Sequence, residues 1–469
     1  MQKHLQKLNP ALWRGKLDKL IRYGIAAILI AVPLYPKFPF LQVPGIYVSI
    51  RIEDFLILIV TVLWLIKNSS NLLQLWKNSI VRAIVLFLAT ALLATASGIF
   101  FLHTATPIVG ILEWGRRVEY LMGFFIAITS IKSQKDIEFY VKCVGIVLIV
   151  VFVYGFGQKY FAWPVITTQN SEYSKGIALR YVAGGHLSSS FSGNYDLATY
   201  IILTSPIFIS ILFMKKESLK RFLDIDERVA RGLVFFILAI SFWLMVNAAS
   251  RISAASYMMA LSITLILIRK YKYILVVGIV TVIFAFTTSS LFNRYLNILD
   301  LIRKRMSFAP AAYAQSVVSP LPVSTPQPPP APAFEDRSTS IRVNVEWPRS
   351  IRAFEKNPLL GTGYGSTTLA TDNDYLRALG EIGILGVISM FFVFFRIIKE
   401  LIQKSWPKGI LSKKEIDFRT VYLAGIIGAI PGILLNAVFL DMFEASKFAI
   451  TFWFLIGFAV ILTIHEKNY

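Results

Sequence analysis

Residues 341–385 read IRVNVEWPRSIRAFEKNPLLGTGYGSTTLATDNDYLRALGEIGIL, and this stretch says most about the fold. It holds arginines, a glycine-spaced turn and paired aspartates, and it runs directly into an apolar helical pattern. Most of the remaining chain is apolar enough to sit in a lipid bilayer. Charged side chains are costly near lipid, so we expect this segment to act at a membrane surface.

The composition is that of a membrane protein. Of 469 residues, 56% are hydrophobic and 16% charged, and the mean hydropathy is +0.62; soluble domains carry about 25% charged residues. A spanning helix needs about 20 mainly apolar residues, and about twelve segments qualify. The sequence therefore predicts an all-α polytopic membrane protein. The predicted spans centre near Ile28, Val60, Leu88, Phe124, Val147, Ile207, Leu238, Leu261, Val280, Phe392, Ile427 and Phe454.

A long external loop with short helices of its own is predicted between the ninth and tenth spans. Residues 1–290 are expected to hold spans one to nine, and residues 376–469 spans ten to twelve. The loop, residues 291–375, starts with an amphipathic helix that lies along the membrane surface. A proline-rich insert at 309–334 follows, which cannot bury a core. The last part of the loop is the polar segment quoted above.

The net charge of +21 reflects membrane orientation rather than nucleic-acid binding. Lys and Arg gather before the first span and after the sixth, eighth and tenth. These positions share one side of the membrane, which the positive-inside rule assigns to the cytoplasm. Both termini are therefore expected in the cytoplasm, and the long loop outside.

External arginines are the first candidate ligands. Arg116 and Arg117 lie in ILEWGRRVEYL, in the outer half of the fourth span. An internal ion pair with Glu113 is the alternative to a functional role there. Arg251 lies in NAASRISAASYMMAL, among small residues that let helices approach closely.

Arg180 and Arg342 complete the set of external arginines. Guanidinium groups bind phosphate bidentately and stay charged. Several of them near the outer leaflet suit a lipid pyrophosphate.

The GTGYG turn contains Gly361 and Gly363. A dinucleotide-binding turn needs a strand before it and a helix after it, and the sequence predicts neither. We expect these glycines to let the backbone turn sharply at the membrane face, with amides that help to bind an anion.

DNDYLRALGEIGILG is expected to carry an acidic group into the tenth span. Asp372 and Asp374 flank Asn373, and either Asp374 or Thr371 is expected to cap the helix. Capping does not explain both aspartates. A carboxylate beside a bound acceptor sugar is suited to take the proton from its hydroxyl group.

Further polar groups surround this segment in the predicted topology. Glu381 is either a buried partner of Arg377 at i,i+4 or a pocket residue. Asp441 and Glu444, in the last external loop, are further acids. His186 lies in GGHLSSSFSGNYDLATY, near Asn194. It is the second candidate for a catalytic base.

Three separated segments resemble the O-antigen ligase and polymerase superfamily. They are SSSFSGNYDLATYIILTSPI around Asn194, NAASRISAASYMMAL around Arg251, and the segment from residue 341 onward. The last is the most specific, in its order of arginine, tryptophan, Asn-Pro, glycine turn, asparagine, Tyr375 with the following leucine, and Gly-Ile-Leu-Gly. The family consists of polytopic enzymes that act on undecaprenyl-pyrophosphate-linked glycans.

The resemblance implies metal-independent, inverting glycosyl transfer without a cofactor, on the periplasmic face of the cytoplasmic (inner) membrane. The partners it implies are a polyprenyl-pyrophosphate-linked glycan donor, a glycan, lipid or protein acceptor, and membrane lipids. Arg251 matches the family's arginine after a serine, and Arg342 its loop arginine. In the ligases a histidine precedes the loop asparagine, whereas Asp372 stands there in this chain. Asp372 or His186 is then the base.

Two alternatives remain open from the sequence. One is a surface-polysaccharide polymerase rather than a ligase. The other is a lipid-linked glycan flippase or transporter, which needs charge near the bilayer midplane, whereas the unusual charges here lie toward the outer face.

Overall fold

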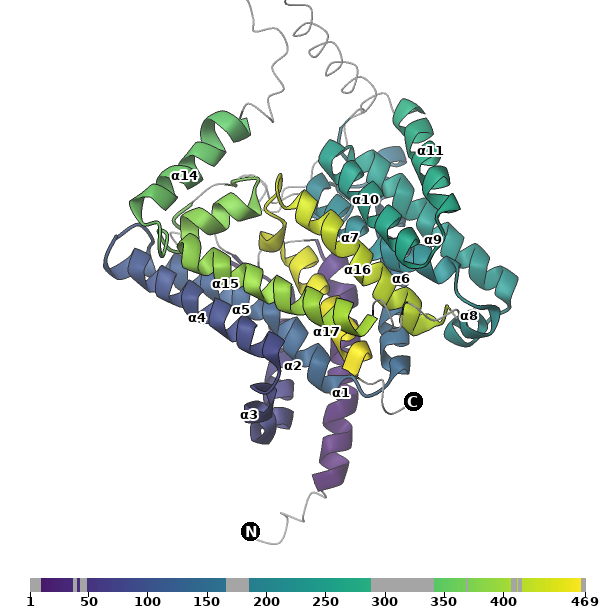
Figure 1. Ribbon diagram of the computed structural model, residues 1–469, viewed down its shortest axis with the longest axis horizontal. Coiled ribbons are helices and arrows are strands. Elements are labelled where there is room, and N and C mark those ends of the chain that lie inside the picture. The colour runs from purple at the N-terminus through teal and green to yellow at the C-terminus, as the bar shows by residue number, and fades with distance from the viewer. Residues whose placement is uncertain are drawn as a thin grey trace, which may run out of the picture.

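The fold is that of a computed structural model, which describes residues 10–36, 40–42, 49–165, 185–287, 341–367, 370–405, 411 and 416–464. Every predicted span centre falls inside a helix, so the all-α prediction is confirmed (Figure 1). The long helices are α1 (Pro10–Leu34), α2 (Ile52–Asn68), α4 (Ser79–Phe100), α5 (Pro107–Ser130), α6 (Gln134–Tyr160), α7 (Asn194–Leu212), α9 (Glu227–Ala248), α10 (Arg251–Leu267), α11 (Lys272–Thr287), α15 (Asp374–Ser405), α16 (Phe418–Asn436) and α17 (Ser446–Ile464).

Short elements connect the long helices. They are β1 (Leu41–Gln42), β2 (Ser49–Ile50), η1 (Ser69–Asn71), α3 (Leu72–Leu75), α8 (Lys216–Leu223), η3 (Arg342–Glu346), α14 (Trp347–Lys356) and η5 (Met442–Glu444). The two strands form an antiparallel pair with Leu41 opposite Ile50.

Eight helices in the described part of the chain are long and apolar enough to cross a membrane. α10 and α11 are apolar but shorter. α5 carries four charged residues near its start, from Glu113 to Glu119, and so falls outside a purely hydropathic definition. The strict criterion therefore counts fewer spans than the predicted number of about twelve.

The core lies around α17, where 94% of the most apolar stretch is buried. α17 packs on α5 and also contacts α15, α16 and α7. α7, α10 and α16 form a second tightly packed group, and α4 lies along α15. Because α17 is hydrophobic all round, its position in the interior follows from its composition.

Polar loops gather at one end of the bundle, which we call the loop end. It comprises residues 101–106, 185–193, 341–373 and 437–445 as far as they are described. Thr104 donates through Oγ1 to the Thr362 carbonyl at 2.6 Å. Lys447 donates to the Ser190 carbonyl at 2.6 Å. Figure 1 shows α14 at this end, opposite α3 and the start of α1.

Basic residues mark the other end of the bundle. Asp18 pairs there with Lys67 at 2.6 Å and with Lys132. The loops between successive helices therefore lie alternately at the two ends of the bundle, as expected when each helix crosses a membrane.

α15 is broken near its start. Gly383 has φ 63° and ψ −172°, so a short helix, residues 374–382, precedes the long part of α15. Residues 357–363 fill the break: Gly363 N donates to the Glu381 carbonyl at 2.8 Å, and Ile384 N to the Pro358 carbonyl at 2.9 Å. This non-helical backbone is stable inside the helix bundle because its N–H and C=O groups form hydrogen bonds with other groups of the protein.

Several predicted features lie outside the described residues. These are the amphipathic stretch and the proline-rich insert of the long loop, and Arg180.

Candidate active site at the loop end

Arg342 and Asp372 form the ion pair at the centre of the candidate site. η3 carries Arg342, whose Nε and Nη2 lie 3.0 and 2.8 Å from Oδ2 of Asp372. The guanidinium carbon is 5.8 Å from the ring centre of Tyr195, in the first turn of α7. The long loop and two helix starts therefore meet at this arginine. Asp372 has a φ of 50°, in the left-handed region, where Asp is one of the few residues found readily.

Glu346 is a second carboxyl group beside this pair. It ends the π-helical turn η3, one turn after Arg342. Its Oε2 atom is buried and accepts no hydrogen bond. Burial, and then the charge of Asp372, raise the pKa of Glu346 to about 7. Burial also raises the pKa of Asp372, and it outweighs the opposing effect of Arg342.

Asn373, and not Asp374 or Thr371, caps α15. The Leu376 amide donates to Oδ1 of Asn373 at 2.9 Å, which corrects the predicted cap. Asp374 instead accepts from the amides of Met442, at 2.9 Å, and Phe443. Its carboxylate thus fastens the last loop to the start of α15.

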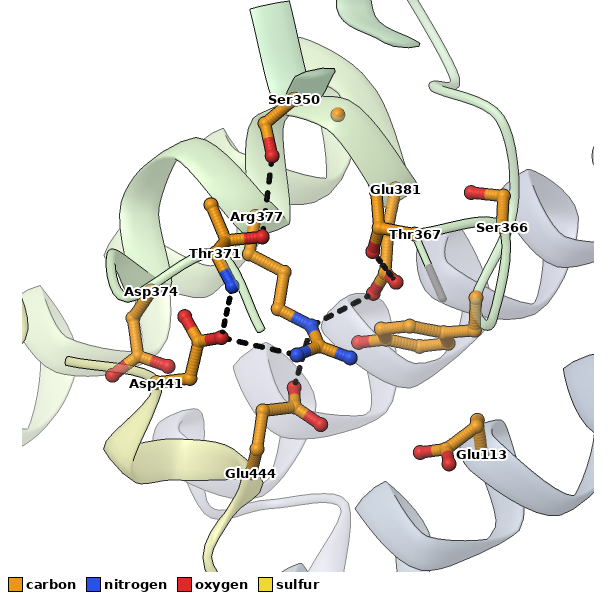
Figure 2. Close-up of polar contacts among 12 residues, drawn as sticks. Glu113, Ser350, Ser366, Thr367, Thr371, Asp374, Arg377, Glu381, Asp441 and Glu444 are labelled. Atoms are coloured by element: carbon orange, nitrogen blue, oxygen red, sulfur yellow. Dashed lines mark hydrogen bonds and ion pairs between the residues drawn. The ribbon is translucent and has the colours of Figure 1, made fainter. Parts of the chain in front are cut away.

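A buried ion network surrounds Arg377, on the short helix of α15 (Figure 2). Its Nη1 lies 3.1 Å from Asp441, and its Nε lies 3.6 Å from Glu381 and 3.7 Å from Glu444. Both predicted roles of Glu381 are found, because it pairs with Arg377 and also lines the small cavity described below. Glu381 also accepts from the Thr367 hydroxyl.

Asp441 links this network to the base candidate. It accepts from the Thr371 amide at 2.7 Å and the Asn373 amide at 3.0 Å, on either side of Asp372. The backbone position of Asp372 is therefore fixed by a carboxylate from the last loop.

Arg117 extends the network across to α5. It pairs with Glu113 at 3.4 Å and with Glu444, and its guanidinium carbon lies 4.8 Å from the ring centre of Tyr364. Burial by itself would raise the pKa of Glu444. The positive charges of Arg117 and Arg377 outweigh this effect, so the pKa of Glu444 lies below its ordinary value. The charge of Arg117 is met within the protein, so the alternative considered from the sequence, an internal ion pair with Glu113, is found for this arginine.

Arg116 extends the charged surroundings of α5 toward α2. It is half-buried and lies within electrostatic range of Glu113 and of Asp54, at the start of α2. The two adjacent arginines of α5 therefore share Glu113 as a neighbouring charge.

A small cavity lies under the loop, with a volume of about 70 Å³. Arg117, Arg377, Glu381 and Glu444 line it together with apolar side chains such as Phe394. Its size suits a few water molecules and not a lipid pyrophosphate.

The glycine turn is a packing element. Gly361 and Gly363 have φ values of 68° and 88°. A Cβ on Gly361 would lie 2.5 Å from the carbonyl carbon of Glu381. Their amides, and that of Thr362, all donate to backbone carbonyls within the protein. The expected anion-binding amides are therefore already in use.

A chain of hydrogen bonds connects the helix starts that carry Arg251 and Tyr195. Arg251 is the first residue of α10, capped by Ser250. Ser253 Oγ, in that turn, donates to Asn436 Oδ1 at 3.1 Å. Asn436 Nδ2 then donates to Thr199 Oγ1 at 2.8 Å, and Thr199 Oγ1 to the Tyr195 carbonyl at 2.8 Å. The fully buried Asn436 thus joins α16 to both helix starts.

Asn194 and Tyr375 have structural contacts. Asn194 Nδ2 donates to the Ala248 carbonyl at 2.9 Å, which ties the start of α7 to the end of α9. Tyr375 donates through its hydroxyl to the Leu434 carbonyl at 2.8 Å. Asn194 directly precedes Tyr195 and Tyr375 directly follows Asp374, so both contacts lie next to the candidate site along the chain.

His186 lies at the loop end, where its side chain is exposed. The neighbouring Leu187 amide donates to the Asn247 carbonyl at 3.0 Å, which places this loop beside the end of α9. Within the described ranges, no three His, Cys, Asp or Glu side chains are placed to hold a metal ion together.

The sequence interpretation did not single out Glu346, Arg349, Asn436 or Tyr195. Glu346 and Arg349 could have been found from the sequence, because they follow Arg342 by four and seven residues, a spacing that places side chains on one face of a helix. Asn436 has a weaker one, as an amide at the end of an apolar helix. Nothing in the sequence marks Tyr195.

The fold and the site together define a polytopic membrane protein with a charged site at one end of its helix bundle. Residues 236–391 match the family model described as O-antigen ligase. The match runs from α9 into α15 and includes Arg251, Arg342 and Asp372. This part of the chain is therefore similar to the O-antigen ligase family, and it contains two of the three segments that carry the resemblance in the sequence, the one around Arg251 and the one from residue 341 onward. No curated protein sequence matches the chain significantly.

The family implies a glycosyltransferase-like membrane enzyme of polysaccharide biosynthesis, with a lipid-linked glycan donor and an acceptor at the membrane. The apolar helices together with the O-antigen ligase match agree with a multi-pass protein of the bacterial inner membrane.

Proposed function

We propose that this protein transfers glycans from a polyprenyl-pyrophosphate-linked donor to an acceptor hydroxyl group on the outer face of the cytoplasmic membrane. The observation that carries the proposal is the meeting of Arg342, Asp372 and Tyr195 at the loop end. Arg342 and Asp372 lie within the residues that match the family model, as do Arg377 and Glu381 of the ion network.

Arg342 and Arg251 are proposed to bind the donor pyrophosphate. Arg342 uses Nε and Nη2 for Asp372, which leaves others of its five N–H donors for phosphate oxygens. Arg251 stands at the start of α10, where the helix dipole also favours an anion. Arg116 and Arg180 remain candidates for further contacts.

In the reaction, the acceptor oxygen attacks the anomeric carbon of the donor sugar from the face opposite the pyrophosphate, which inverts the configuration. The bond from that carbon to the pyrophosphate oxygen breaks, and the lipid pyrophosphate leaves with the electron pair. Fixed guanidinium groups stabilise the charge that develops on it, and such groups contribute most where water is excluded. The proton of the acceptor hydroxyl passes to a base of the site, for which Asp372 and His186 are the candidates from the sequence.

The ion network under the site is proposed to hold the geometry rather than to bind the donor. Its two arginines, Arg117 and Arg377, are buried between carboxylates. A flippase, which needs an open charged path between the two ends of the bundle, fits this arrangement less well. Ligase and polymerase activity differ in the product, because a polymerase lengthens the glycan on its lipid carrier.

The test is transfer from a lipid-linked glycan donor by the purified protein in detergent or vesicles. Arg342→Ala and Arg251→Ala, made separately, are each expected to lower transfer at least tenfold. Arg352→Ala is the matched control, because Arg352 is exposed on α14. Size-exclusion elution as for wild type shows that each variant is folded. Full transfer by both site variants would remove the proposal.

A further inference from the structure

Glu346 stands in an unusual position for a carboxylate. Its buried Oε2 atom has no hydrogen-bond donor, although it lies next to two arginines on its own helical segment, Arg342 and Arg349. A buried carboxylate oxygen without a hydrogen-bond donor destabilises the fold, unless a bound substrate supplies the donor during the reaction. It also lies in a π-helical turn, a feature often found at functional sites.

Asp372 is poorly placed to accept a proton. Its Oδ2 atom lies 3.0 Å from Nε and 2.8 Å from Nη2 of Arg342. Protonation at that oxygen would break the pair that holds Arg342 in place. A carboxylate bound to a guanidinium group in this way orients the arginine. Burial raises the pKa of Asp372, but the oxygen atom in question is already occupied by two N–H donors of Arg342.

From this geometry we infer that Glu346 is the group that takes the proton from the acceptor hydroxyl, while Asp372 positions Arg342. The inference rests on the proposed function and adds a catalytic residue to it. As the acceptor oxygen bonds to the anomeric carbon, its proton moves to Oε2 of Glu346. The lipid pyrophosphate leaves with the electrons of the broken bond, so charge and atoms balance.

The surroundings of Glu346 fit this role. The charged groups that act on it are Asp372, Arg342, Asp441 and Arg349. Burial and then Asp372 raise its pKa to about 7, close to the pH at which a general base works best. Below this pH Glu346 is protonated and cannot accept the proton, so transfer is expected to fall as the pH drops through about 7.

The experiment compares kcat and donor KM of Glu346→Gln with those of wild type between pH 5.5 and 8.5. A general base contributes about 10²–10⁴-fold, so kcat is expected to fall at least 100-fold, with donor KM changed less than threefold. The acidic limb of the wild-type profile is expected to vanish in Glu346→Gln. Glu346→Asp is expected to restore part of kcat. Glu355→Gln, an exposed glutamate of α14, is the matched control and keeps wild-type kinetics.

The outcomes separate this inference from the proposed function. If wild type transfers glycan and Glu346→Gln keeps more than a third of its kcat, or keeps the acidic limb, Glu346 is not the base. If Glu346→Gln loses donor binding together with kcat, its role is structural and the inference also fails. If folded wild type shows no transfer from a lipid-linked donor, the proposed function fails and the inference falls with it.

Discussion

Replacing Arg377 by Met removes the centre of the buried ion network with little change in volume. Asp441, Glu381 and Glu444 then lose the guanidinium group that lies 3.1–3.7 Å from them. Removing one member of a buried ion pair costs about 3–5 kcal/mol, because the remaining charge is left without a partner. We expect a loss of stability of this size.

The loss converts into a measurable shift of the melting temperature. An unfolding entropy of about 2.1 cal/mol/K per residue gives about 1 kcal/mol/K for 469 residues. The Tm of Arg377→Met is therefore expected to lie about 3–5 °C below wild type. Tryptophan fluorescence or calorimetry of the purified protein in detergent measures this, with an exposed arginine variant, Arg352→Met, as the control.

A second substitution tests whether charge is the cause. Arg377→Met combined with Glu381→Gln removes one of the stranded carboxylates, so the double variant is expected to melt at a higher temperature than Arg377→Met alone. The reasoning is refuted if Arg377→Met melts within 1 °C of wild type. It is also refuted if Glu381→Gln gives no recovery in the double variant.

Three further changes have defined outcomes. Gly361→Ala forces a left-handed φ and a Cβ 2.5 Å from backbone; the loss of at least about 2 kcal/mol should appear as a lower Tm, whereas Gly232→Ala, with open space around it, should not lower it. Asn373→Ala should cost about 1 kcal/mol and speed hydrogen exchange of the Leu376 amide, and Asn373→Ser should not. Asn436→Leu removes the acceptor of the Ser253 hydroxyl group and the amide donor to the Thr199 hydroxyl group; Tm should fall and donor KM rise, and unchanged values of both would contradict the proposed link to Arg251.

The helices were predictable because the length and hydrophobicity of each segment decide them locally. Arg377 and Glu381 were predictable as a pair, since their spacing of four residues places them on one helix face. The acids of the last loop were expected at the same end of the bundle, from the alternation of spans alone.

The pairing of side chains far apart in sequence was not predictable. Arg342 and Asp372 are separated by 30 residues, and only the fold of the loop brings them together. Asp374 has the sequence signature of a helix cap, but tertiary contacts from Met442 and Phe443 take its carboxylate, and Asn373 caps instead. The preference of aspartate for capping the helix start is overridden here, because the carboxylate binds backbone amides of the last loop, which is far away in the sequence.

The break at Gly383 has a consequence for how the chain enters the membrane during synthesis. The part of α15 after Gly383 is about 33 Å long at 1.5 Å per residue, close to the thickness of the hydrocarbon layer. The charged short helix before it, with Arg377 and Glu381, need not partition into lipid with the rest. A translocon can release the apolar part laterally as an ordinary span. The charged part is then assembled afterwards from the aqueous side, once α5 and the last loop can supply its counter-ions.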